Sequence, residues 1–149
     1  MDEKLFQDVP YEKWSRNGQS VDVCVGYKNI KYLNRITKEK ELCKEVDRWL
    51  LEQKKEEPVC VIVYSMHTAF LAAACRVKRN RKNTKIVLIV PDLPQFMDLK
   101  MSIIKKMLKK MDWYRIQGYR KLIDKYVLYS APMAKFLELK DNEWMVMEG

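Results

Sequence analysis

The sequence predicts an α/β protein built around a mostly parallel sheet. Two short runs, Val59–Tyr64 and 86–90, are almost wholly apolar. A strand with one wet face would alternate, so we expect each run to be buried on both faces of a parallel sheet. Strand-like and helix-like segments also alternate along the chain, which is typical of right-handed strand–helix–strand crossovers. A hydrophobic content of 48% in 149 residues is enough for a globular core.

The first third of the chain contains one expected strand and one expected helix. Residues 1–20 are polar and punctuated by proline and glycine, so we expect a loop or a weakly structured segment. Valines alternate with other residues near 21–26, which predicts a strand that ends at Gly26. Apolar residues recur at helical spacing within 37–55, which predicts a helix before the strand at 59–64.

The rest of the chain continues the alternation. Thr68 is a suitable capping residue, and the alanine-rich run after it favours a helix to about residue 79. The further elements that we expect are a strand at 85–90, helices at 98–110 and 112–124, a strand at 126–129, a helix with Pro132 in its first turn, and a strand at 144–147.

The positive charge of the chain is concentrated in its middle third. The net charge is +9. Residues 76–125 hold 15 Lys and Arg against 4 Asp and Glu, a net charge of +11. The remainder holds 14 Lys and Arg against 16 Asp and Glu, a net charge of −2. Such a one-sided excess indicates an anionic partner, namely phosphates, nucleic acid or a lipid surface.

The basic region includes an amphipathic stretch in which Lys105, Lys106, Lys109 and Lys110 accompany apolar and aromatic residues. A basic amphipathic helix of this kind can lie on an anionic membrane, and we expect these four lysines to face it. Two alternatives stay open: a contact with nucleic acid, or a surface helix whose apolar stripe packs on the sheet. Because no nucleic-acid-binding motif is present, we do not expect a nucleic-acid partner.

Polar residues follow both apolar strands. His67, the only histidine, comes just after the strand at 59–64, with Ser65 and Thr68 on either side. Asp92 follows the strand at 85–90 and lies between two prolines. The carboxyl ends of parallel strands are where α/β sheets bind ligands, so these residues predict a binding or catalytic site. The structural alternatives are a hydrogen-bonded core histidine and an aspartate that bonds to its own turn.

Several classes of site are absent from the sequence. With four glycines, the chain has no G-x-S-x-G, no G-x-G-x-x-G and no phosphate-binding G-x-x-x-x-G-K-[ST] motif. The four cysteines lack C-x-x-C spacing, so we expect buried free thiols in a reducing compartment, no metal and no cofactor. No segment has the apolar length of a signal peptide or a membrane span, so we expect a cytoplasmic protein, peripheral on the inner face of the membrane if the lysines bind lipid.

Taken together, the segments 61–68, 87–94 and 126–137 form a pattern, which the final Met-Val-Met-Glu-Gly extends. The pattern resembles the N-terminal, acceptor-binding domain of GT-B fold glycosyltransferases of the retaining family 4. The resemblance covers about residues 20–149. It implies a single Rossmann-like domain at 21–149, incomplete because the family's first strand and Gly-rich loop do not precede residue 20.

The resemblance also implies roles for the residues at the strand ends. His67 would be catalytic, close to the anomeric centre of the donor sugar. Ser65, Thr68 and Asp92 would bind the acceptor, a saccharide or a lipid-linked saccharide. The nucleotide-sugar donor would bind only with a C-terminal domain or a partner chain, so the chain alone is expected to be inactive. The alternative function is a non-catalytic α/β partner that recruits a separate transferase to a membrane. An unpaired sheet edge would also allow pairing with a second copy.

Overall fold

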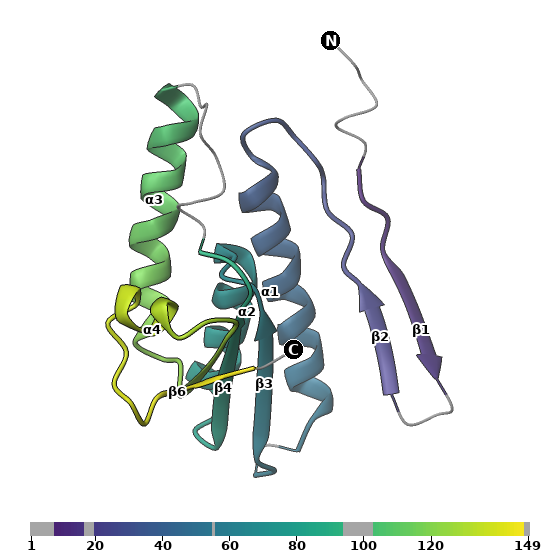
Figure 1. Cartoon of the computed structure of the whole chain (residues 1–149). Helices are drawn as coiled ribbons and strands as arrows, with labels where there is room; N and C mark the ends of the chain where they lie inside the picture. Colours follow the sequence, from purple (N-terminus) through teal and green to yellow (C-terminus); the bar gives the residue numbers. More distant parts are fainter. Residues whose placement is uncertain (1–7, 17–19, 55, 94–102, 148–149) are drawn as a thin grey trace. The chain divides into compact units, whose positions relative to one another are not determined.

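The computed structural model describes residues 8–16, 20–54, 56–93 and 103–147. The chain divides into two compact units, Met1–Gln53 and Lys54–Gly149, whose elements are labelled in Figure 1. The candidate residues at the strand ends all belong to the second unit.

The first unit contains an antiparallel strand pair and a long helix. Strand β1 (Glu12–Arg16) pairs with β2 (Ser20–Cys24), and α1 (Asn34–Glu52) follows. Two predictions are corrected here. Residues 12–16, expected as loop, form a strand, and the strand expected near 21–26 belongs to this two-stranded sheet instead of the parallel one. The cause is the pairing of the two segments with each other, which no single-strand pattern reveals.

Beyond the paired residues of β1 and β2, the two chain segments stay close together, and this close approach requires a glycine at position 26. Val9 and Tyr27 exchange backbone hydrogen bonds of 2.9 and 3.0 Å. A Cβ atom on Gly26 would lie 2.6 Å from the backbone nitrogen of Tyr11. The backbones therefore approach each other too closely for any side chain at position 26.

The second unit is an α/β domain with a four-stranded parallel sheet flanked by helices. Its strands lie in the order β3-β4-β5-β6 and all pair in parallel. The elements are β3 (Val59–Tyr64), α2 (Thr68–Asn80), β4 (Thr84–Val90), α3 (Ile103–Arg120), β5 (Lys125–Leu128), α4 (Pro132–Phe136) and β6 (Trp144–Val146). The expected α/β class with a parallel sheet flanked by helices is confirmed, and so is the order of elements from residue 59 onward except between residues 98 and 124.

One helix replaces the two expected between residues 98 and 124. Helix α3 runs without a break for 18 residues, and residues 98–102 of the expected first helix lie outside the described part of the chain. Asp112 was expected to begin a second helix, yet it lies inside α3. No proline interrupts this stretch, and a single aspartate is too weak a helix breaker to end a continuous run of helix formers.

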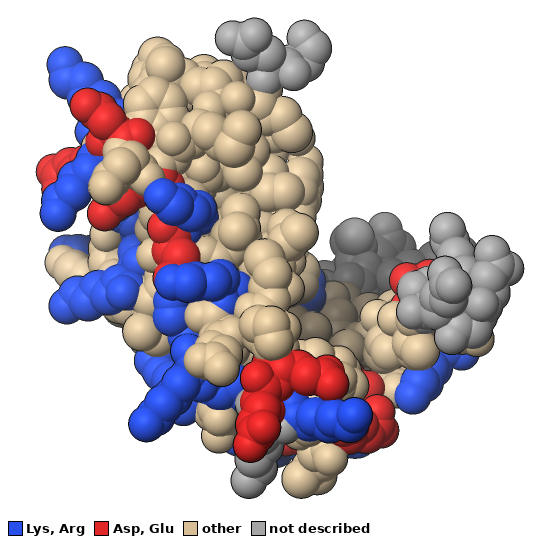
Figure 2. Space-filling model, turned by 90° about the horizontal axis from the view of Figure 1, so that it is seen from below, with Lys and Arg blue, Asp and Glu red and all other residues tan. Residues whose placement is uncertain are grey.

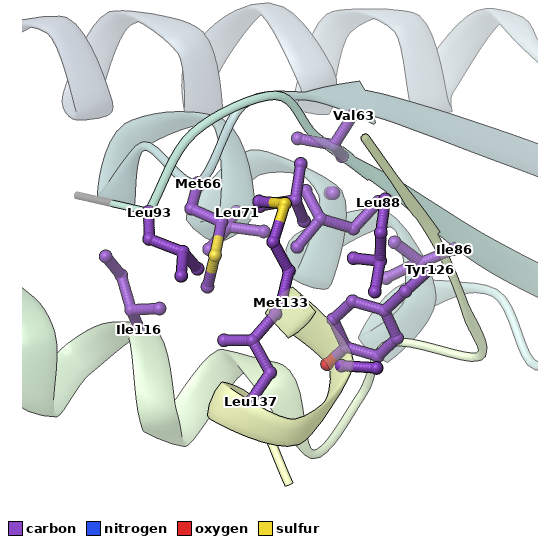
Figure 3. Packing of buried hydrophobic residues seen from close by; sticks show 14 of the residues in the cluster. Val63, Met66, Leu71, Ile86, Leu88, Leu93, Ile116, Tyr126, Met133 and Leu137 are labelled. Atoms are coloured by element: carbon purple, nitrogen blue, oxygen red, sulfur yellow. The ribbon is translucent and has the colours of Figure 1, made fainter. Parts of the chain in front are cut away.

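The three helices of this unit pack on the same face of the sheet. Alternate strand residues such as Val63, Leu88 and Leu128 form one buried cluster with Leu71 of α2 and Ile116 of α3, and α4 adds Met133 and Ala134. Figure 3 shows these side chains pointing toward one another from the strands and the helices. Each new strand is added on the same side of the previous one, and right-handed crossovers then place every connecting helix on one face.

The opposite face of the sheet is therefore not covered by α2, α3 or α4. On β3 the exposed fractions of Ile62 and Tyr64 are 67% and 56%. Val87 and Ile89 of β4 and Val127 of β5 are half-buried. The prediction that both apolar strands are buried on both faces is thus corrected for β3. Cys60 lies on the same exposed face, so the four free cysteines include one exposed thiol, and Cys75 alone is buried.

Asp124 joins α2, β4 and the start of β5. Its carboxylate accepts hydrogen bonds from Lys78, from the Ile86 amide at 2.8 Å and from Lys85 at 3.2 Å. Its own amide donates to the Ile86 carbonyl at 2.9 Å. Partial burial alone would raise the pKa of Asp124, but the bonds from Lys78, Ile86 and Lys85 together lower it below the usual value. This carboxylate fixes the register of β5 beside β4.

Among the helices that the structure describes, none combines the length and apolar character needed to cross a bilayer.

We predict that Asp124→Asn lowers the free energy of unfolding by about 1–3 kcal/mol, because the Lys78 ammonium loses its anionic partner in a half-buried site. A carboxylate with a depressed pKa stabilises the fold above its unfolded pKa and loses this effect as the pH falls through the folded value. The difference between wild type and variant should therefore shrink below about pH 4. Urea unfolding at several pH values, with the exposed Asp141→Asn as control, measures it. An equal loss in both variants would contradict this role.

Candidate functional site

The candidate site is the carboxyl edge of the parallel sheet, defined as Tyr64–Thr68 after β3, 91–92 after β4 and 129–130 after β5. Ser65 begins the first of these turns. Its amide donates a 2.8 Å hydrogen bond to the Ile89 carbonyl, so it extends the β3–β4 ladder by one residue. Its φ of 77° is a left-handed conformation that residues other than glycine rarely adopt. Such strained positions concentrate at functional sites.

His67 occupies the capping position before α2 and its side chain is exposed. Its carbonyl accepts the first backbone hydrogen bond of the helix, from Leu71 at 3.0 Å. Its imidazole makes an edge contact with Phe70, with the ring centroids 5.6 Å apart. The imidazole thus lies in contact with solvent at the carboxyl edge, where it can donate to a ligand or accept from one.

The residues beside His67 anchor the turn. Met66 is 2% exposed and Thr68 is 8% exposed, so both side chains face the interior. Thr68 is therefore less accessible than Ser65 or His67, which leaves it a smaller role in binding than the sequence suggested. Because both neighbours of His67 are buried, the backbone of this turn is anchored and His67 stays at the carboxyl edge.

The sequence analysis missed two tyrosines, Tyr64 and Tyr129, that meet near the carboxyl edge. The hydroxyls of Tyr64 and Tyr129 are 3.4 Å apart, although 65 residues separate them. The hydrogen bond with Tyr64 is the largest of the effects that raise the pKa of Tyr129, and the negative charge of Asp92 adds to them. Asp92 itself is exposed. The structure thus brings Tyr64 and Tyr129 together, at the same edge of the sheet as Asp92, which follows β4.

Strand register explains why these tyrosines meet. Tyr64 pairs with Ile89, which pairs with Val127, so residues 64 and 129 project from the same uncovered face near the same edge. Their exposed fractions are 56% and 44%. A signal was present in the sequence, since a tyrosine ends each of two apolar strands. The two tyrosines can be recognised as neighbours only when it is known that both strands flank β4 in the sheet.

The predicted membrane-facing lysines of α3 differ in their exposure. Lys106 and Lys110 are exposed, and the ammonium of Lys110 lies 5.9 Å from the Tyr114 ring centroid. Lys109 is half-buried. The Lys105 side chain lies outside the described part of the structure. Lys106 and Lys110 are thus accessible to a partner, and Lys109 less so.

Many other cations of the basic region lie at the amino edge, where β4 and β5 begin, and stabilise the fold there. Lys78 donates to the Leu122 carbonyl at 2.8 Å and Arg81 to the Glu57 carbonyl at 2.9 Å. Arg120 and Lys125 donate to the carbonyls of Leu137 and Asn142. Figure 2, a view from below, shows basic and acidic side chains intermingled. On the face seen in Figure 2, the positive charges therefore do not form one continuous surface for an anion.

The carboxyl edge offers hydrogen-bonding groups and exposed aromatic rings. The imidazole, the Asp92 carboxylate and two phenol hydroxyls can bind hydroxyl groups, and the tyrosine rings can contact an apolar surface. No acidic residue lies in the first turn of α2, so the positive end of that helix is not neutralised. Among the described residues, no cluster of histidine, cysteine and carboxylate side chains could hold a metal ion.

Comparison of the chain with protein-family models, with curated proteins and with solved structures finds no match.

We predict that position 65 tolerates glycine and rejects β-branched residues. Ser65→Gly should retain or slightly raise the free energy of unfolding, because glycine adopts a positive φ without steric cost. Ser65→Val should lower it by about 1–3 kcal/mol, because a β-branched residue is strained there. Chemical unfolding followed by circular dichroism compares the two. Equal unfolding midpoints would show that the left-handed turn is not maintained in solution.

Proposed function

We propose that the chain is the acceptor-side portion of a glycosyltransferase, which transfers a sugar from a nucleotide diphosphate sugar to a saccharide or lipid-linked acceptor. The observation that carries the proposal is the carboxyl edge of the parallel sheet, at which the exposed His67 and Asp92 and the paired Tyr64 and Tyr129 all lie. Ligands of open α/β sheets bind outside this edge.

The chemistry of these groups suits a sugar. A saccharide presents hydroxyls that both donate and accept, together with apolar C–H faces. The Asp92 carboxylate accepts hydrogen bonds, the two phenols do both, and their exposed rings supply apolar surface. The negative charge of Asp92 acts on Tyr129 and disfavours an anionic group at this edge. We therefore assign the neutral part of the acceptor to Tyr64, Tyr129 and Asp92.

His67 and the start of α2 suit the reacting end. In the transfer, the acceptor oxygen bonds to the anomeric carbon, the bond from that carbon to the diphosphate oxygen breaks, and the proton of the acceptor hydroxyl passes to the departing diphosphate. Positioning of the hydroxyl and stabilisation of phosphate charge supply most of such catalysis. An exposed imidazole can orient a hydroxyl, and an unneutralised helix N-terminus favours a nearby phosphate. Nucleotide recognition is assigned to a further domain or a partner chain.

The proposal predicts that the chain binds neutral saccharides more readily than free nucleotide sugars. Saturation-transfer NMR with methyl glucosides, methyl mannosides and maltose, and separately with UDP-glucose and GDP-mannose, measures both. Tyr64→Phe and Asp92→Asn should each weaken saccharide binding by about two- to tenfold, because each loses a hydrogen bond. Tyr114→Phe, an exposed tyrosine on α3, is the matched control.

Two results would overturn the proposal. Saturable binding of nucleotide sugars without saccharide binding would place a donor site in this chain. Absence of all sugar binding would favour the alternative of a non-catalytic partner subunit. In a transferase assay with the donor-binding portion present, His67→Ala should abolish transfer and leave the melting temperature nearly unchanged, because its side chain is exposed. A large fall in melting temperature would instead assign His67 a structural role.

A further inference from the structure

Helix α3 exposes an apolar stripe to solvent. Ile103, Met107, Met111 and Tyr114 follow one another at helical spacing, and their exposed fractions are 86%, 59%, 55% and 65%. At 100° per residue these four side chains fall within an arc of about 80°. Four large apolar residues in one row form a surface that a monomeric protein rarely leaves in water.

The stripe faces away from the sheet. Ile116, the residue by which α3 joins the core, is 3% exposed, and it lies about 180° around the helix from the centre of the stripe. Figure 1 shows the first turns of α3 projecting past the ends of β3 and β4. The alternative in which the apolar stripe of this helix packs on the sheet therefore fails for Ile103, Met107 and Met111, whose exposure the core does not explain.

Positive charge flanks the stripe. On the helical wheel Lys106 and Lys110 border one side of the stripe and Arg115 borders the other, and all three residues are exposed. Over its whole length α3 carries six Lys and Arg and one Asp, a net charge of +5. A narrow apolar stripe between cations is the pattern of a helix that lies in a membrane interface.

We propose that α3 docks on an anionic lipid surface, with its four stripe residues among the acyl chains and Lys106, Lys110 and Arg115 at the head groups. Nucleic acid could pair with the cations of α3, but it would leave the apolar stripe in contact with water. An anionic lipid surface accommodates both the cations and the apolar stripe, so we favour lipid as the partner. The stripe lies at the end of α3 that follows β4, on the same side as the carboxyl edge. This inference does not depend on the proposed function.

Co-sedimentation with vesicles tests the docking. Vesicles of phosphatidylcholine and phosphatidylglycerol in equal parts should bind the chain, and vesicles of phosphatidylcholine alone should bind it more weakly. Ile103→Ser with Met107→Gln should lower the partition coefficient by about tenfold or more. Lys106→Gln with Lys110→Gln should lower it by about fivefold per lysine and remove most of its salt dependence.

Matched controls keep the test specific. Met145→Gln changes an apolar residue of similar exposure on the sheet, and Lys82→Gln changes an exposed lysine at the amino edge. Both should bind vesicles like wild type. A second pair, Met111→Gln with Tyr114→Ser, replaces the first if that variant loses its circular-dichroism spectrum. The proposal fails if vesicles do not bind, if the stripe variants bind like wild type, if Met145→Gln loses as much, or if duplex DNA competes with the vesicles fully.

Discussion

The second unit depends on one constraint: each new strand is added on the same side of the sheet, and each crossover is right-handed. In the order β3-β4-β5-β6 this rule places α2, α3 and α4 on one face. This placement of the helices explains why one face of the sheet forms the buried cluster. It also explains why the row with Tyr64 and Ile89 is uncovered and why the apolar stripe of α3 points outward. If the chain had added a strand on the other side of β3, the right-handed crossover would have placed the connecting helix on the opposite face of the sheet.

The two edges of the sheet use charge in different ways. At the amino edge, Lys78, Lys85 and Asp124 form ion pairs, and other cations donate to backbone carbonyls. The cations that donate to carbonyls provide hydrogen-bond donors for backbone acceptors that helices and strands leave unpaired at their ends. At the carboxyl edge, His67 and Asp92 are exposed instead. The charged groups at the amino edge thus stabilise the fold, whereas those at the carboxyl edge are exposed. The carboxyl edge is where open α/β sheets bind their ligands.

Local patterns predicted most of the second unit. The strand at 59–64 matches its predicted bounds, and the position of His67 just past a buried strand was recognisable from spacing. The failures are non-local. The β1–β2 pair depends on which segments meet, and the contact of Tyr64 with Tyr129 joins residues from two strands that do not touch. The face to which the α3 stripe points also depends on where α3 meets the core.

The central claim is that the carboxyl edge binds a saccharide. Backbone amide shift mapping by NMR, with maltose and methyl mannoside added to the isotope-labelled chain, tests it most directly. We expect the largest shifts at Ser65, His67, Asp92 and Tyr129, with Lys82 and Asn142 at the amino edge unchanged. Shifts confined to the amino edge, or spread evenly over both edges, would contradict the account.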